Sequence, residues 1–268
     1  MKILVCVKQV PDTTEIKIDP VKKTLIRDGV PSIVNPFDTY ALEMAARIKD
    51  AGGASITILS MGPAQAESAI RQCLAVGGDA GYLVTDRAFG GSDTLATSYI
   101  LSQAIRYIEK KDNEKFDIIF CGKQAIDGDT GQVGPEIAEH FGYAQVTYAT
   151  EAALENDCLV VKRDTDEGYD RISVQLPAVV TVTKTSFEPR YPNIRSKLAA
   201  TKAEIAHITL SELEGEMDVT RIGLKGSPTK VKKTFTPERN SDCHYFDGDN
   251  PALAAKQLTE KLSELKLI

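Results

Sequence analysis

The chain has 268 residues, of which 42% are hydrophobic and 26% are charged, the composition of an ordinary soluble protein. A net charge of -6 argues against a nucleic-acid binder, because such a protein would normally carry a basic face. No apolar run approaches the roughly 20 residues that cross a bilayer, and the N-terminus has a strand pattern rather than that of a signal peptide. We therefore expect a cytoplasmic protein with no membrane insertion.

Strand and helix patterns alternate over about the first 145 residues, which predicts an α/β fold with a doubly wound, mostly parallel sheet. The short apolar runs predict buried strands at 2–7, 55–61, 80–85 and 117–121. Helix patterns follow near 38–51, 63–76, 92–110 and 132–142. We expect Asn35 to cap the first of these helices and Ser92 or Asp93 to cap the third. The first connection, 8–37, is unusually long and contains an alternating segment at 15–19; loops of that length in compact domains are often functional.

The hydrophobic period changes to two between 157 and 184, with a turn signal at Glu167-Gly168. This pattern predicts a hairpin that extends the sheet, followed by one further strand. Residues 188–250 are polar and proline-containing, with too few apolar side chains for a core of their own. A last helix, from Asn250 to Leu265, carries an apolar stripe that needs a partner surface. We therefore predict a nucleotide-binding domain at 1–187, and a partner-docking loop and C-terminal arm at 188–268.

The segment from Cys121 to His140 is a glycine-rich loop between a strand pattern and a helix pattern. Glycines let backbone N–H groups approach an anion, and the free N–H groups at a helix start favour negative charge. The loop therefore predicts a phosphate site, although an ordinary strand-to-helix connection would have the same composition. Asp127 and Asp129 would repel phosphate, so we expect them to cap the following helix.

A second glycine-rich turn lies at Asp86 to Ser98, where Gly90 and Gly91 leave a strand and Ser92 to Thr94 begin a helix. One such cradle suffices for a monophosphate, whereas two at neighbouring strand ends suit a dinucleotide. The alternative is a tight turn with an ordinary helix cap.

Five widely spaced cysteines without any C-x-x-C pair indicate reduced thiols, mostly in the core. The three histidines form no metal set with them, and no Ser/His/Asp or Cys/His pattern indicates a nucleophile. We predict no metal site and no catalytic side chain, so any chemistry would come from a cofactor.

Four segments give the chain a resemblance to the beta subunit of electron transfer flavoprotein over essentially its whole length. They are VCVKQVPD near the start, NPFDTYALE at 35–43, CGKQAIDGDTGQVGPEIA at 121–138 and KRDTDEGYDRISVQLPAVVTV at 162–182. The resemblance implies a nucleotide-binding fold similar to that of adenine-nucleotide hydrolases, and a heterodimer with a larger alpha subunit. Because of the second glycine-rich turn, the chain is most similar to the electron-bifurcating branch of anaerobes.

That branch implies FAD as the bound cofactor and NADH as the hydride donor. One electron then passes to ferredoxin or flavodoxin, and the other passes through the alpha-subunit FAD to a flavin dehydrogenase of the acyl-CoA dehydrogenase kind or another. Any NADH-oxidising activity would belong to the complex. The main alternative is a non-bifurcating beta subunit that binds AMP.

Carried over position by position, the resemblance and the two glycine-rich turns give the following cofactor-binding residues: Cys6, Asn35, Pro36, Phe37, Asp38, Met61, Gly90, Gly91, Ser92, Asp93, Thr94, Thr97, Gly122, Lys123, Gln124, Ala125, Ile126, Asp127, Gly128, Asp129, Thr130, Gly131, Gln132 and Val133.

One departure from the family concerns the segment from Glu188 to Lys197, which is shorter than in beta subunits that serve acyl-CoA dehydrogenases and lacks their anchoring leucine. A docking surface with Ile194, Arg195 and Lys197 would remain. Two remote alternatives stay open: an adenine-nucleotide-using enzyme, since Phe89 to Thr94 is similar to a pyrophosphate loop, and a nucleotide-sensing module without enzymatic activity.

Overall fold

The computed structural model describes residues 1–12, 31–232, 243–246 and 248–268, so the alternating segment at 15–19 lies outside the described residues. The chain divides into two compact units, Met1–Lys232 and Lys233–Ile268. Within the second unit, the helix α7 (Pro251–Glu264) is capped by Asn250, whose side chain accepts a hydrogen bond from the N–H of Leu253. None of the described helices is both long and apolar enough to cross a membrane.

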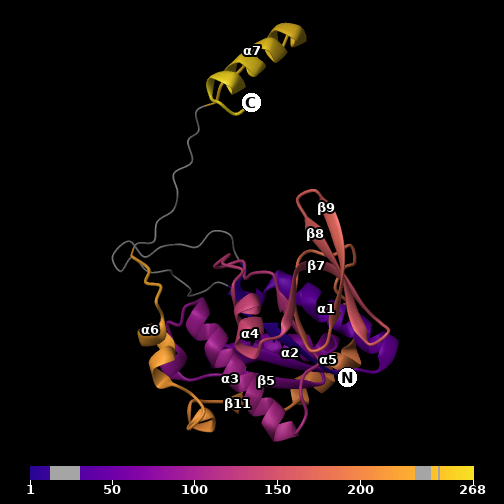
Figure 1. Ribbon diagram of the computed structural model, residues 1–268, viewed down its shortest axis with the longest axis vertical. Helices are drawn as coiled ribbons and strands as arrows, with labels where there is room; N and C mark the ends of the chain where they lie inside the picture. Colours follow the sequence, from indigo (N-terminus) through magenta and orange to yellow (C-terminus); the bar gives the residue numbers. More distant parts are fainter. Residues whose placement is uncertain (13–30, 233–242, 247) are drawn as a thin grey trace. The chain divides into compact units, whose positions relative to one another are not determined.

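The first unit is built on a nine-stranded sheet with the strand order β11-β5-β4-β1-β6-β10-β7-β8-β9 (Figure 1). Neighbouring strands are parallel from β11 to β7, and only β8 and β9 are antiparallel to their neighbours. The bounds are β1 Lys2–Val7, β4 Ser55–Met61, β5 Ala80–Val84, β6 Ile118–Gly122, β7 Ala144–Glu155, β8 Cys158–Thr165, β9 Gly168–Gln175, β10 Ala178–Val182 and β11 Ile205–Ile208. Two short strands, β2 (Gln9–Pro11) and β3 (Ser32–Val34), form a separate antiparallel pair.

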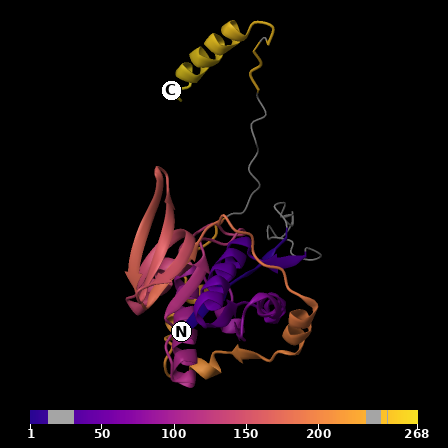
Figure 2. The same cartoon turned by 90° about the vertical axis from the view of Figure 1, so that its right-hand side faces the viewer.

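Helices cover both faces of the sheet, as the doubly wound pattern predicts. The helices α1 (Pro36–Gly52) and α2 (Glu67–Val76) pack on one face, and α3 (Thr94–Asp112) and α4 (Val133–Phe141) pack on the other. The predicted fold class, with its hairpin extension, is confirmed. Figures 1 and 2 show the hairpin of β8 and β9 extending beyond the helix-covered part of the first unit.

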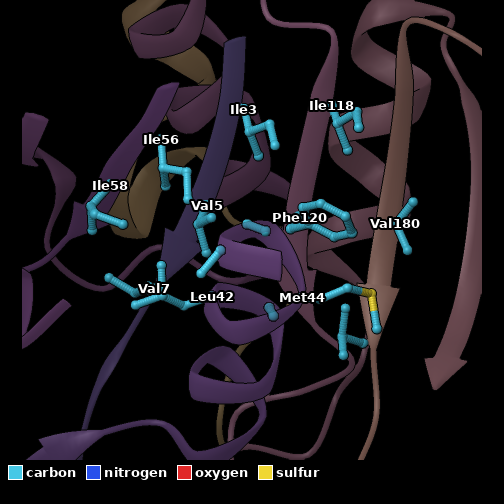
Figure 3. Close-up of a cluster of buried hydrophobic side chains, with 14 of the residues drawn as sticks. Ile3, Val5, Val7, Leu42, Met44, Ile56, Ile58, Ile118, Phe120 and Val180 are labelled. Carbon is cyan, nitrogen blue, oxygen red and sulfur yellow. The ribbon is translucent and has the colours of Figure 1, made fainter. Parts of the chain in front are cut away.

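Alternate residues of the central strands divide between the two cores because side chains in a strand point to opposite faces. In β1, Ile3 and Val5 face the core under α1, whereas Leu4 faces the core under α3. Figure 3 shows the first of these cores, in which side chains from β1, β4 and β6 meet Leu42 and Met44 of α1. Burial on both faces explains why these strands have almost continuous apolar sequences.

The first unit extends to Lys232, whereas we expected the domain to end at 187. The helix α5 (Ile194–Lys202) packs on α2, and β11 pairs in parallel with β5, the edge strand of the predicted part. Leu213 and Ile222, the latter just before the short helix α6 (Gly223–Gly226), are buried in the core under α3. These apolar residues are too few for a core of their own, but they suffice to extend one that exists.

Short 3₁₀ turns complete the connections of the first unit: η1 Ala64–Ala66, η2 Arg87–Phe89, η3 Ser211–Leu213 and η4 Val219–Arg221. Gly223 follows the last of them with a φ of +60°, a backbone conformation that favours glycine. A Cβ at this position would overlap the carbonyl oxygen of Ala88. The segment around Gly223 therefore lies directly on the turn after β5.

This close approach leads to a stability prediction. Gly223→Ala should lower the free energy of unfolding by about 2–4 kcal/mol, because it adds a backbone clash to the cost of a left-handed alanine. Gly53→Ala is the matched control, since Gly53 has a φ of +71° with nothing within 4 Å of its Cβ position. The control should cost only about 1–2 kcal/mol. Equal shifts of the two denaturation midpoints would contradict this packing.

Candidate functional site

A cleft of about 430 Å³ lies at the carboxyl ends of the central strands. The strand β1 lies between β4 and β6 in the sheet. The strands β4 and β5 extend the sheet on one side of β1, and β6 and β10 extend it on the other, so the strand order reverses direction at β1. In open α/β sheets, ligands bind at such a switch point, and the volume is in the range of pockets for small molecules and cofactors. The cleft therefore occupies the position and has the size of a nucleotide site.

The cleft brings together predicted residues from five separate parts of the chain: Cys6, Asn35, Asp38, Met61, Ser92, Asp93, Thr94, Thr97, Gly122, Lys123, Gln124, Ala125, Gly128, Thr130, Gly131, Gln132 and Val133. It does not include the predicted residues Pro36, Phe37, Gly90, Gly91, Ile126, Asp127 and Asp129. Sequence reasoning missed the lining residues Val7, Lys8, Leu59, Leu101, Cys121, Gly134 and Thr229.

The buried side chain of Asn35 holds the loop after β6. Its Nδ2 donates to the carbonyl oxygen of Gln124 (2.8 Å), and its Oδ1 accepts from the N–H of Ile126 (3.1 Å). The expected role of Asn35 as a side-chain cap of α1 is wrong, because its amide forms these bonds instead.

Asp38, also buried, joins three elements at one point. Its carboxylate accepts hydrogen bonds from the N–H of Lys8 (2.7 Å), the N–H of Gly122 (3.1 Å) and Nδ2 of Asn35 (2.9 Å). Burial raises the pKa of Asp38 to about 7, and these donors oppose that rise. The ends of β1 and β6 are thus fixed relative to the start of α1.

The loop after β6 has two parts, one whose backbone N–H groups are hydrogen-bonded within the chain and one whose N–H groups are not. In the first part, the N–H groups of Lys123, Gly128 and Asp129 bond to carbonyl oxygens of the chain. In the second part, the N–H groups of Thr130, Gly131 and Gln132 form no hydrogen bond with any residue in the described ranges. These three residues line the cleft next to the start of α4, where the helix leaves further N–H groups unpaired. This part of the loop offers donors to an anion.

The two predicted aspartates of the loop have structural partners. Asp127 pairs with Nζ of Lys8 (2.6 Å), and Asp129 accepts from Nε2 of Gln124 (2.7 Å). Neither caps α4, whose N-cap is Gln132 without a side-chain cap, so the expected capping role is wrong. The cations at the cleft are Lys8 and Lys123, and Lys8 had a visible signal as a basic residue directly after the first strand.

At the second glycine-rich turn, Asp93 caps α3, as expected, by accepting from the N–H of Ala96 (3.0 Å). A distant segment covers this turn: Oγ of Ser227 accepts from the N–H of Asp93 (2.8 Å), and the N–H of Thr229 donates to Asp93 (2.9 Å). A Cβ at Gly91 would come within 3.3 Å of Leu224. The two glycines are exposed and lie outside the cleft, with Leu224 packed against Gly91, while the first turn of α3 lines the cleft.

The starts of α3 and α4 lie side by side at the cleft. Oγ1 of Thr94 donates to Oε1 of Gln132 across a distance of 3.1 Å. Both N-terminal dipoles are therefore close to the same space, together with the two lysines. A doubly wound sheet with a cleft at this position is typical of the α/β proteins that bind nucleotides.

Comparison with known proteins identifies the family. Residues 22–213 match the electron transfer flavoprotein domain. The chain is 50% identical to the electron transfer flavoprotein subunit beta of Megasphaera elsdenii over 272 aligned positions that cover both chains completely. It is 41% identical to the caffeyl-CoA reductase-Etf complex subunit CarD of Acetobacterium woodii, again over both whole chains. It is 42% identical to the protein FixA of Azorhizobium caulinodans, over 90% of this chain and 86% of that one. The chain belongs to the electron transfer flavoprotein beta-subunit family, which confirms the resemblance found in the sequence.

The buried carboxyl of Asp38 leads to a pH prediction. Its pKa is about 7 in the folded protein and ordinarily 3.8, so the folded state binds the proton more tightly. The resulting stabilisation is complete below pH 3.8 and is lost as the pH rises through 7. Wild type should therefore lose about 2–3 kcal/mol more unfolding free energy than Asp38→Asn between about pH 5 and about pH 8. Denaturant titrations of both proteins at several pH values measure this difference, and parallel curves would disprove it.

Proposed function

We propose that this chain is the FAD-binding beta subunit of an electron-bifurcating electron transfer flavoprotein. It accepts hydride from NADH, and the electrons pass to ferredoxin or flavodoxin and, through the alpha-subunit FAD, to a dehydrogenase. FAD supplies the step between two-electron and one-electron transfer that no side chain at the cleft can supply. The NADH-oxidising activity belongs to the complex.

The observation that carries this proposal is the pair of helix starts at one cleft. A monophosphate needs one helix N-terminus, whereas the two phosphates of a dinucleotide can use both. The starts of α3 and α4 are linked through Thr94 and Gln132, and residues from both line the cleft. Two neighbouring helix starts at one cleft favour FAD over AMP, the alternative ligand.

The residues of the chain have separate roles in this proposal. The N–H groups of Thr130 to Gln132 and of the first turn of α4 bind phosphate, and Lys123 supplies positive charge beside them, while Lys8 is paired with Asp127. Asn35 and Asp38 do not contact the nucleotide in this assignment; they hold the loop and the strand ends that do. Met61 and Leu59 form the apolar wall at the end of β4.

Two exposed apolar surfaces of the chain fit partner chains. In α7, Leu253, Leu258 and Leu265 are exposed, and we assign this surface to the alpha subunit. In the first unit, Tyr191, Ile194 and Leu198 are exposed on and before α5, and we assign this surface to the dehydrogenase. The relative from Acetobacterium woodii is named as a subunit of a caffeyl-CoA reductase-Etf complex, which supports a partner that acts on an acyl-CoA.

The nucleotide content of the purified alpha-beta complex tests the assignment. We expect two FAD and no AMP per pair of chains, identified by mass and absorbance after release from the protein. The flavins should bleach on anaerobic addition of NADH. One FAD with one AMP would show instead that the chain is a non-bifurcating beta subunit.

A substitution in the phosphate loop tests the role of its backbone. Gly131 has a φ of +65°. A Cβ added to this residue would lie 3.3 Å from the carbonyl oxygen of Lys123. Gly131→Val should weaken nucleotide retention about tenfold or more, because a β-branched residue cannot adopt this conformation without moving the loop.

Gly142→Val is the matched control, because Gly142 also has a left-handed backbone, with a φ of +64°, but lies at the C-terminal end of α4 and outside the cleft. Its Cβ position has nothing within 4 Å. This variant should retain nucleotide as the wild type does in equilibrium dialysis. If a folded Gly131→Val complex keeps its full nucleotide content, the loop is only a structural connection.

A further inference from the structure

Two cysteines form a pair at the floor of the cleft. Cys6 of β1 and Cys121 of β6 are direct partners in the register of these adjacent parallel strands. Both side chains belong to the core side that faces α3 and α4, and both line the cleft. Cys121 is buried and Cys6 is partly exposed, so the cleft gives access to one thiol and, through it, to the other.

The backbone positions of this pair fit a disulfide. Neighbouring strands are separated by about 4.8 Å, which lies within the range of about 4.4–6.8 Å for the Cα atoms of disulfide-linked cysteines. In-register residues of parallel strands also point to the same face of a sheet, so the two thiols lie side by side. The neighbouring Cys6 thiol, followed by burial, raises the pKa of the Cys121 thiol well above its ordinary range, so Cys121 stays protonated and is the slower of the two thiols to react.

No other two of the five cysteines are placed in this way. Cys73 packs in the core on the opposite face of the sheet, Cys158 lies in β8 of the hairpin, and Cys243 belongs to the second unit. The proposed function uses the cleft but no thiol chemistry, so it does not explain the pairing of Cys6 with Cys121.

We propose that Cys6 and Cys121 are a reactive dithiol, which a peroxide converts to an intramolecular disulfide when no nucleotide fills the cleft. The partly exposed Cys6 reacts first, and the buried Cys121 completes the reaction. The floor of the cleft is thus a modification site as well as a wall of the nucleotide site.

The reaction balances with one hydrogen peroxide per pair. The sulfur of Cys6 attacks one peroxide oxygen, the O–O bond breaks, and a sulfenic acid and one water form. The sulfur of Cys121 then attacks the sulfur of Cys6, the S–S bond forms and the S–O bond breaks. The leaving hydroxide takes the thiol proton of Cys121 and becomes the second water. The two sulfurs are oxidised, and the two peroxide oxygens are reduced.

A nucleotide in the cleft should protect the pair, because the peroxide reaches Cys6 through the same space. This protection rests on the proposed function, whereas the disulfide itself requires only the two thiols. With nucleotide at about 100 times its Kd, about one cleft in a hundred is empty, so disulfide formation should slow about 100-fold.

Peptide mapping of the alpha-beta complex tests the proposal. The complex carries Cys243→Ser to remove the exposed thiol, and it is treated with hydrogen peroxide after nucleotide removal, with and without added FAD or AMP. Free thiols are then alkylated, and the digest is analysed by mass. We expect a linked peptide pair that contains Cys6 and Cys121, is lighter by two hydrogens and is restored by a reductant.

Single substitutions provide the controls. Cys6→Ser and Cys121→Ser should each abolish the linked peptide, while Cys158→Ser should form it at the wild-type rate. Absence of the linked peptide, or oxidation of Cys6 to sulfinic acid without a link, would overturn the dithiol. Equal rates with and without nucleotide, in a complex shown separately to bind that nucleotide, would overturn control by the cleft.

Discussion

The hydrogen bonds of two buried polar side chains, Asn35 and Asp38, hold the cleft together. Asp38 accepts from backbone donors at the ends of β1 and β6, and Asn35 bonds to Gln124 and Ile126 in the first part of the loop that follows β6. A buried carboxylate without such donors would be strongly destabilising, so the polar side chains and the strand ends depend on each other. The positions of the lysines and of the phosphate loop depend on this connection, because Lys8 and Gly122 supply two of its donors.

The helix α1 extends the influence of this connection to the opposite end of the first unit. Asp38 lies in its first turn, and Glu43, further along the same helix, is buried and accepts hydrogen bonds from the backbone and side chain of Arg190. This interaction, together with the pairing of Arg190 with Asp50, fixes the segment that precedes α5. The cleft and the exposed surface around Tyr191 are thus attached to one rigid helix.

The parts of the fold that were predictable from sequence are those whose burial leaves a pattern of apolar residues within the segment itself. The strands β1, β4, β5 and β6 are buried on both faces, and their apolar runs show it. The strand β7 was not predicted, because its alanines and glutamates have low strand propensity and its pairing with β10 and β8 creates the strand. The strand β11 was also missed, because this four-residue segment becomes a strand by pairing with the edge of β5.

The site shows the same division. The glycine-rich loop was visible in the sequence. The ion pair of Asp127 with Lys8 and the hydrogen bond of Ser227 with Asp93 in the second turn were not, because each joins residues more than 100 positions apart. Such contacts arise only when the chain has folded, so motif spacing cannot reveal them.

The path of the chain out of the first unit has a further consequence. Thr229 lines the cleft and donates a hydrogen bond to Asp93 beside the start of α3, and the first unit ends three residues later, at Lys232. A protein that binds the segment 229–232 would therefore contact a residue shared by the cleft and the cap of α3. By thermodynamic reciprocity, if that binding changes the affinity of the cleft for a ligand, the ligand changes the affinity for that protein by the same factor.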